Sequence, residues 1–239
     1  MEFTTPLIEA RLRKRYKRFL ADVELASGEL LTVHTANTGA MLGCSEPGSR
    51  VWLSVSDNPK RKYPHSWEIV EVAPGVLCGI NTLLSNALVS EAIEAGRIPE
   101  LGGYEKLRRE VPYGQERSRI DILLESPQQT AIPSCYVEVK NVTLADDGVA
   151  MFPDAPTARG LKHLRELMEV VKQGERAVLV YCVQREDCSE FRPAEKVDAH
   201  YASVLREAIG QGVEVLAYQA SVSVEAISLD RRLELGVDW

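Results

Sequence analysis

The hydrophobic pattern changes period near residue 80, and this change limits the fold more than any other feature of the chain. Before it, short apolar runs alternate with turn formers such as Glu-Pro-Gly and Asp-Asn-Pro, and no stretch has helical spacing. After it, apolar residues recur at helical spacing in three segments that are separated by strand-like runs. We therefore predict two domains, residues 1–80 and residues 84–239, joined at residues 80–84.

The first domain is predicted to be a small β-barrel. Five strand-like segments without a helix suit a Greek-key barrel of the OB type, although a small β-sandwich would give nearly the same pattern. The predicted segments are residues 7–25, as one long strand or a bent pair, and residues 30–36, 50–55, 67–72 and 75–80.

The second domain is predicted to be a mixed sheet flanked by helices, which places the chain in the α+β or α/β class. The run AVLVYCV at residues 177–183 is continuously apolar, as expected of a strand that is covered on both faces. The predicted helices are residues 84–96, 157–173 and 198–209, and the predicted strands are 107–113, two motif strands, 177–183 and, last in the sheet, 213–218.

The two motif strands carry a set of charged residues. The first, SRIDILL, contains Asp121, and the second, CYVEVK, contains Glu138 and Lys140. Side chains two apart on a strand share a face, so Glu138 and Lys140 lie together, and Asp121 joins them if the strands pair as a hairpin. Two carboxylates can hold Mg²⁺ through hard oxygen ligands while a lysine positions the attacking water. A half-exposed hairpin with a polar outer face is the alternative, because D…ExK spacing alone is a weak signal.

These strands resemble the core of the PD-(D/E)xK nuclease superfamily. Together with the blocks FPDAPTARGLKHLREL, RYKRFLADVEL and HTANTGAMLGC, they make the whole chain similar to the bacterial SfsA family, the sugar fermentation stimulation proteins. The resemblance implies an OB-like domain, then a PD-(D/E)xK nuclease-like domain, and nucleic-acid binding. It also implies Mg²⁺ or Mn²⁺ held by Asp121, Glu138 and the carbonyl of Val139, with Lys140 orienting the water.

A fourth catalytic residue is expected on the helix that precedes the sheet. In many nucleases of this type a glutamate from that helix completes the metal site, and the block NALVSEAI favours Glu91. Glu94 is the rival, and a solvated position on the helix is the alternative for both residues.

Cations gather in the first domain even though the net charge of the chain is −7. Six of the eight residues from 11 to 18 are Lys or Arg, and we expect the odd-numbered and even-numbered ones to occupy opposite faces of a strand. Basic strands with aromatic residues are how OB-folds bind single strands, although charge can also protect an edge strand. The candidate nucleic-acid-binding residues are Arg13, Lys14, Arg15, Tyr16, Lys17 and Arg18, with Lys60, Arg61 and Lys62 as a second patch.

The helix after the motif strands offers a further phosphate contact. Arg159 and His163 are one turn apart near its start, where they could hold a phosphate; a solvated helix face is the alternative. Asp154 and Thr157 are expected to cap this helix. Residues 37–39 form a predicted tight turn whose role the sequence leaves open.

Composition excludes several other classes of protein. The five cysteines are scattered and form no C-x-x-C pair, and the chain has no secretory start and no membrane-length apolar run, so we expect a reduced, cytoplasmic protein without structural zinc or a membrane partner. No phosphate loop, nicotinamide fingerprint or Ser-His-Asp set is present. We expect a Mg²⁺-dependent nuclease acting on DNA or RNA, and the alternative is a non-catalytic DNA-binding regulator of sugar (maltose) fermentation genes. A homo-oligomer is neither indicated nor excluded.

Overall fold

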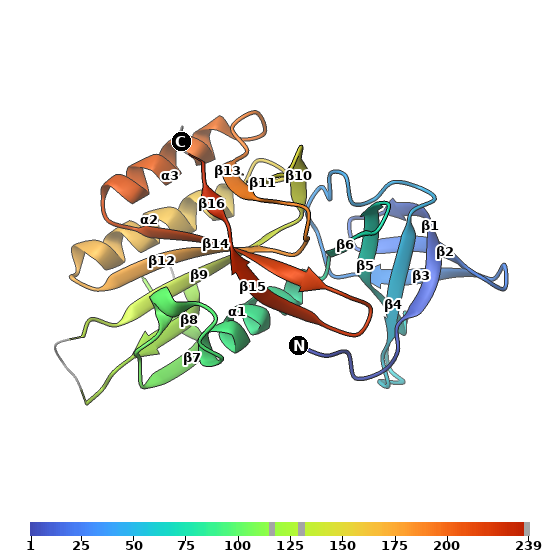
Figure 1. Ribbon diagram of the computed structural model, residues 1–239, viewed down its shortest axis with the longest axis horizontal. Coiled ribbons are helices and arrows are strands. Elements are labelled where there is room, and N and C mark those ends of the chain that lie inside the picture. The colour runs from blue at the N-terminus through green and yellow to red at the C-terminus, as the bar shows by residue number, and fades with distance from the viewer. Residues whose placement is uncertain (115–117, 129–131, 237–239) are drawn as a thin grey trace.

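The structure, a computed structural model, describes residues 1–114, 118–128 and 132–236. Figure 1 shows a small all-β part formed by the N-terminal residues beside a larger part in which helices cover a sheet. The small part ends with strand β6 (Val76–Gly79), and the larger part begins with a short 3-10 helix, η1 (Thr82–Leu84).

The N-terminal part is a closed β-barrel, which confirms the predicted OB-like fold. The strands β1 (Ile8–Tyr16), β2 (Leu20–Leu25), β3 (Leu30–Thr35), β4 (Arg50–Val55) and β5 (His65–Ala73) form one sheet, and pairing of β3 with β5 closes it. The barrel interior contains alternate residues from each strand, including Leu12, Val33 and Trp67, all fully buried. The segment predicted as one long strand or a bent pair is the β1–β2 hairpin.

The larger part is built on a six-stranded mixed sheet, as predicted. Its strands are, in spatial order, β15 (Ile227–Arg232), β14 (Glu214–Val222), β12 (Arg176–Val183), β9 (Cys135–Val142), β8 (Ser118–Glu125) and β7 (Lys106–Tyr113). The three central strands β14, β12 and β9 run parallel, and the outer ones are antiparallel to their neighbours.

Helices cover both faces of this sheet (Figure 1). Helix α1 (Ser85–Glu94) packs on one face, where Leu88 and Val89 meet Val137 and Val139 of β9. Helices α2 (Ala158–Lys172) and α3 (Ala199–Gly210) pack on the other face, in a second apolar cluster. A second short 3-10 helix, η2 (Pro99–Leu101), follows α1. β9 is therefore buried on both sides, so a charged residue in it lies inside the protein.

A second, four-stranded sheet was not predicted. It contains β10 (Leu144–Asp146), β11 (Val149–Phe152), β13 (Glu190–Pro193) and β16 (Glu234–Leu235). These strands span two to four residues, which is too short for a period-2 pattern to stand out. The prediction that residues 213–218 form the last strand is wrong, because β15 and β16 follow it.

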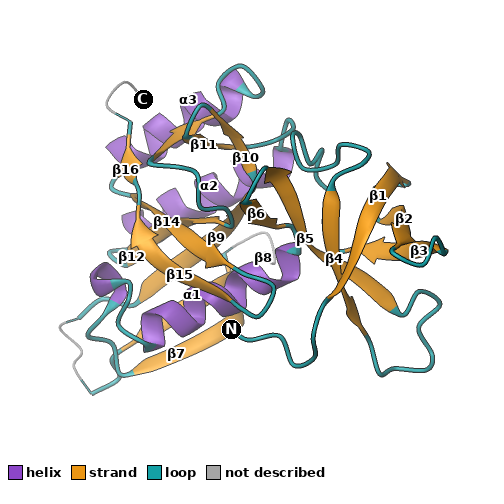
Figure 2. Cartoon of the chain, turned by 45° about the vertical axis from the view of Figure 1, so that its right-hand side comes forward, coloured by secondary structure: helices purple, strands orange, loops and turns teal. Residues whose placement is uncertain are grey.

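Hydrogen bonds join the two parts where β6 and β10 lie near each other (Figure 2). The backbone N–H of Met41 donates to Asp154 Oδ2 at 2.8 Å, and Thr82 Oγ1 donates to the carbonyl of Ala36 at 2.6 Å. The N–H of Gly79 donates to the carbonyl of Gln184. The barrel is thus attached beside the end of the sheet at which β9 finishes. In the described ranges, no helix has the length and apolar character needed to cross a membrane.

Candidate active site

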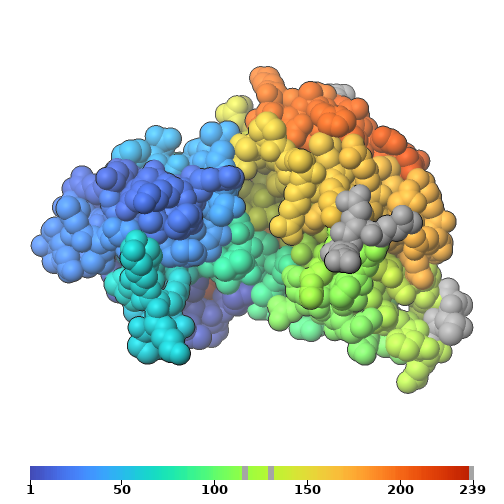
Figure 3. All heavy atoms as spheres, turned by 180° about the vertical axis from the view of Figure 1, so that it is seen from behind, coloured from blue at the N-terminus to red at the C-terminus, as the bar shows by residue number. Residues whose placement is uncertain are grey.

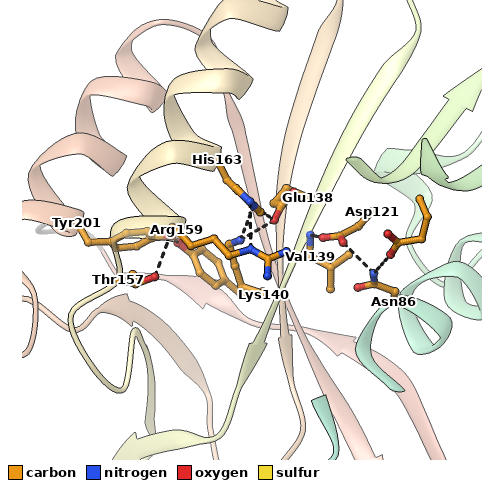
Figure 4. Close-up of polar contacts among 12 residues, drawn as sticks. Asn86, Asp121, Glu138, Val139, Lys140, Thr157, Arg159, His163 and Tyr201 are labelled. Atoms are coloured by element: carbon orange, nitrogen blue, oxygen red, sulfur yellow. Dashed lines mark hydrogen bonds and ion pairs between the residues drawn. The ribbon is translucent and has the colours of Figure 1, made fainter. Parts of the chain in front are cut away.

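The predicted charged residues meet where β8 and β9 separate. The two strands pair from Leu124 opposite Cys135 to Ile122 opposite Val137, and the pairing ends before Asp121. Asp121 Oδ2 instead accepts a hydrogen bond from the backbone N–H of Val139 at 2.7 Å. Figure 4 shows the carboxylates of Asp121 and Glu138 on either side of Val139. The structure therefore brings the two acidic residues to one point on β9.

Glu138 is buried, with only 2% of its side chain exposed. Its Oε1 accepts a hydrogen bond from Lys140 Nζ at 2.6 Å and a second contact from His163 Nδ1. Its Oε2 is also buried and has no hydrogen-bond partner among the described residues. A buried carboxylate oxygen without a partner is costly, so this atom is a place where a positively charged ligand would be stabilised.

The sequence suggested that His163 holds a phosphate, but in the structure this side chain contacts Glu138 instead. The side chain is buried, and its Nε2 accepts a hydrogen bond from Arg159 Nε at 3.3 Å. Because Nε2 accepts, the proton lies on Nδ1, which donates to Glu138. Arg159 itself is exposed, so the rest of its guanidinium can still reach a phosphate.

The start of α2 fixes the position of His163. Thr157 caps the helix, as predicted, through a hydrogen bond from the N–H of Gly160 to its Oγ1 at 3.0 Å. Asp154 does not cap the helix. It accepts from Met41 of the barrel instead, so the predicted capping role of Asp154 is wrong.

The two carboxylates differ in their proton affinity. Burial, followed by the charge of Glu138, raises the pKa of Asp121 to about 6. Burial also acts to raise the pKa of Glu138, but Lys140 and His163 together outweigh it, so this pKa is lowered. Burial, followed by the charges of Glu138, Glu166 and Asp121, raises the pKa of Tyr113. Negative charge is therefore crowded at this point, as it is in sites that bind cations.

Glu91, the predicted fourth residue, lies elsewhere. It is 42% exposed and binds the N-terminal ammonium of Met1 at 3.0 Å and Arg97 at 2.9 Å. Glu94 is exposed as well. The prediction of a glutamate from α1 in the metal site thus finds no support in the contacts of either residue.

Two residues that sequence reasoning missed, Asn86 and Glu110, lie beside Asp121 instead of Glu91. Asn86 of α1 donates from Nδ2 to Asp121 Oδ1 at 2.8 Å and to Glu110 Oε1 at 3.2 Å. The register of β7 and β8 sets Glu110 opposite Asp121, and Glu110 has a left-handed φ of 54°. Only the strand register, which the sequence does not contain, could have identified Glu110.

A hard divalent cation fits the donors present. Among the described residues no three side chains of Asp, Glu, His or Cys converge as a ready-made metal cage. The available oxygens are those of Asp121, Glu138 Oε2 and the Val139 carbonyl. Mg²⁺ commonly binds through one or two carboxylates and completes its shell with water or substrate phosphate.

Comparison with known proteins identifies the family. Residues 14–80 match the SfsA N-terminal OB domain, and residues 83–226 match the sugar fermentation stimulation protein RE domain. The chain belongs to the SfsA family. Sugar fermentation stimulation protein homologs from Pseudomonas fluorescens (strain SBW25) and Thioalkalivibrio sulfidiphilus are 55% and 56% identical to it, over 100% and 98% of both chains.

The fold of the SfsA family is also known from a solved structure. The structure of Pyrococcus furiosus SfsA in complex with Ca²⁺ superposes with a TM-score of 0.87 at 28% sequence identity. The match covers 99% of this chain and 98% of the other. Both the barrel and the larger part of the fold are therefore shared with that protein.

The basic segment of this SfsA-family barrel, residues 11–18, is less available for nucleic-acid contact than its sequence suggests. Arg13 pairs with Glu24, and Lys14 pairs with Asp22 at 3.3 Å. Asp22 also accepts from the hydroxyl of Tyr16 at 2.8 Å. These residues stay candidates for nucleic-acid contact, but each would have to give up or share a partner.

Two other cations of the segment support a loop. Arg15 Nη2 donates to the carbonyls of Asn37 and Gly39 at 3.0 and 2.9 Å, and Arg18 Nε donates to that of Thr38 at 3.0 Å. Because β1 ends at Tyr16, Lys17 and Arg18 form a turn with φ values of 49° and 63°, and the predicted opposite faces of a strand do not apply to them.

The second basic patch lies on the loop between β4 and β5. Arg61 donates to Ser66 Oγ at 3.1 Å, and Lys62 lies over the ring of Tyr63 at 5.4 Å. Lys60 and Lys62, like Lys17 in the other turn, are exposed and have no ion-pair partner among the described residues.

Proposed function

We propose that this SfsA-family protein binds DNA or RNA and hydrolyses its phosphodiester bonds with the help of Mg²⁺ or Mn²⁺. The observation that carries the proposal is the group of Asp121, Glu138 and Lys140, in which Glu138 Oε2 is buried and has no partner among the described residues. A polar hairpin face with no function would leave these side chains in water. Here Glu138 is 2% and Lys140 is 11% exposed.

Asp121, Glu138 Oε2 and the Val139 carbonyl would hold the cation. When bound, it would supply Lewis acidity toward the phosphate and lower the pKa of its bound water. The Ca²⁺ complex of the Pyrococcus furiosus relative supports a divalent cation on this fold. The crowding that raises the pKa of Asp121 supports it independently, because a cation removes the repulsion between the two carboxylates.

Lys140 has two tasks in this proposal. One N–H of its ammonium is directed to Glu138 Oε1, and Nζ also lies 3.1 Å from His163 Nδ1, so at least one N–H remains for a water molecule or a phosphate oxygen. The fixed position of Glu138, which His163 also contacts, sets the position of Lys140 in turn. Donors that are held in place before the reaction stabilise the charge that develops on the phosphate.

The binding-only regulator is the weaker alternative. It would use the basic residues of the barrel, several of which already have acidic or carbonyl partners. It would also leave the buried Glu138 without a purpose, although burying a carboxylate oxygen without a partner destabilises the fold.

The test is a cleavage assay on labelled single- and double-stranded DNA and RNA with Mg²⁺ or Mn²⁺. We expect cleavage by the wild type and none by Glu138→Gln or Lys140→Met, while binding persists in both variants. Glu169→Gln is the matched control, because Glu169 is an exposed residue of α2 that pairs only with Lys172 among the described residues. Cleavage by Glu138→Gln would contradict the assigned site, and bound but uncut nucleic acid with the wild type would favour the regulator.

A further inference from the structure

A cavity of about 200 Å³ lies between the barrel and the larger part of the fold. Seen from behind, in Figure 3, the surface is hollowed where the N-terminal residues, in blue, meet the segment in yellow. The cavity is lined by barrel residues 37–39 and by residues 141–144, which directly follow Lys140. It therefore adjoins the proposed catalytic centre.

The cavity wall on the barrel side is held in a fixed shape. Arg15 and Arg18 bind the carbonyls of residues 37–39, and Asn37 Oδ1 accepts from the N–H of Gly39 at 2.9 Å. A Cβ at Gly39 would come within 2.6 Å of Asp154 Oδ2, so a larger residue there would displace the Asp154 carboxylate. The turn whose role the sequence left open is thus fitted against the larger part of the protein.

The lining has one apolar side and one polar side. Leu144, Met151 and Phe152 supply the apolar surface. On the polar side, Asn141 Oδ1 accepts from Ser85 and Gln184. The amino group of Asn141 has no partner among the described residues. Likewise, no described residue donates to Asp154 Oδ1, whose neighbouring oxygen binds Met41. None of the described residues that line the cavity is Lys or Arg, which disfavours a phosphate inside it.

These features match one unpaired nucleobase. A cavity of about 150 Å³ in another protein holds a benzene ring, so 200 Å³ accommodates a single base but not a base pair. Flat rings rest on apolar side chains, and a carboxylate accepts a hydrogen bond from an exocyclic amino group. Thymine and uracil have no such amino group, and their one ring donor, N3–H, lies between two carbonyl oxygens that a carboxylate repels. Asp154 can therefore select cytosine, adenine or guanine over these two bases.

We propose that this cavity binds one unpaired base of the nucleic acid next to the scissile phosphate, with Asp154 as the residue that selects an amino-bearing base. The inference rests on the nucleic-acid binding in the proposed function. It makes the substrate single-stranded, or a strand whose base has left the stack, because a paired base cannot enter.

The test measures binding without cleavage, in EDTA, by fluorescence anisotropy with labelled single strands of about 12 nucleotides. We expect oligo(dC) and oligo(dA) to bind about tenfold more tightly than oligo(dT), and duplex to bind more weakly than any of them. Asp154→Asn keeps an oxygen for Met41 but should remove most of this preference. Asp146→Asn, at the exposed end of β10, is the matched control.

A second variant, Met151→Trp, fills the cavity and should weaken binding of all three single strands at an unchanged unfolding temperature. Equal affinity of the wild type for oligo(dC) and oligo(dT), or an unchanged preference in Asp154→Asn, would overturn the inference even if the protein cleaves nucleic acid. Base-selective binding without cleavage under any metal would uphold the cavity and overturn the nuclease. Failure to bind any strand would overturn both.

Discussion

Asp121→Asn should stabilise the metal-free protein at neutral pH, although it removes a proposed catalytic group. Burial and Glu138 raise the pKa of Asp121 from 3.8 to about 6. At about 1.4 kcal/mol per pKa unit, the ionised side chain destabilises the fold by roughly 3 kcal/mol. The sign follows from the raised pKa: the destabilisation is absent below the unfolded pKa, grows as the pH rises from about 4 to about 6, and is complete above that.

The amide keeps one hydrogen bond and loses another. Its oxygen can accept from the N–H of Val139, but its amino group would face Nδ2 of Asn86, which loses an acceptor. That loss is worth about 1 kcal/mol. We therefore expect Asp121→Asn to raise the free energy of unfolding by about 2 kcal/mol near pH 7 and to lower it by about 1 kcal/mol near pH 4.

Urea unfolding in EDTA across this pH range measures the difference directly, with Asp146→Asn, at the exposed end of β10, as the control. Mg²⁺ at about 100 times its Kd should then stabilise the wild type by about 2.7 kcal/mol and leave the variant unchanged. A variant that is equally destabilised at both ends of the pH range would refute the reasoning about charge. Equal stabilisation of both proteins by Mg²⁺ would refute Asp121 as a ligand.

Three further predictions test the surroundings of the site. His163→Phe should lower kcat of cleavage about 10- to 100-fold with little change in KM, because it removes a contact that positions Glu138. An unchanged kcat in steady-state kinetics would mean that the histidine only fills space. Glu110→Gln should weaken Mg²⁺ binding about tenfold in calorimetry while oligonucleotide binding in EDTA stays the same, and an unchanged Mg²⁺ affinity would contradict a role beside Asp121. Replacing the three exposed lysines Lys17, Lys60 and Lys62 by Gln should reduce the slope of log K against log salt for single strands by about 2. An unchanged slope would place the phosphates elsewhere.

The order of the main elements could be predicted because each carries its own periodic signal. The continuous apolar run of β12 and the apolar stripe of α2 result from burial in the centre of the fold, and both occur where expected. The second sheet could not be predicted. Apart from the short β10–β11 hairpin, its pairs join residues far apart in the chain, such as Val149 with Glu190 and Glu190 with Glu234, and such pairing leaves no local pattern.

In the candidate site, too, the local features could be predicted and those set by packing between elements could not. Glu138 and Lys140 share a face because they are two apart on one strand, which is a local property. The choice of Glu91 depended on how α1 is rotated against the sheet. Asn86, which does reach Asp121, is five residues earlier, and at about 100° per residue the two side chains point about 140° apart. The helix could be predicted, but the face that it presents to the strands could not.

The basic segment shows the corresponding limit for charge. A run of six cations in eight residues predicts a strongly positive surface only if its partners are ignored. Glu24 and Asp22 come from the neighbouring strand β2, opposite the cations of β1, so the hairpin offsets part of its own charge. Arg15 is drawn further in, to the carbonyls of a loop, where burial lowers its pKa.

Three unfavourable features coincide at the end of β8 and β9, and this coincidence links the stability of the protein to its proposed activity. Asp121 has a raised pKa, Glu138 Oε2 is buried without a partner among the described residues, and Glu110 has a left-handed φ that a residue with a Cβ rarely adopts. Unfavourable features of this kind gather at functional sites, where the rest of the fold holds them in place. A cation between the carboxylates would relieve the first two together. Their joint response to Mg²⁺, in stability and in pH dependence, therefore separates a metal site from a structural ion pair, whose stability would not depend on the metal.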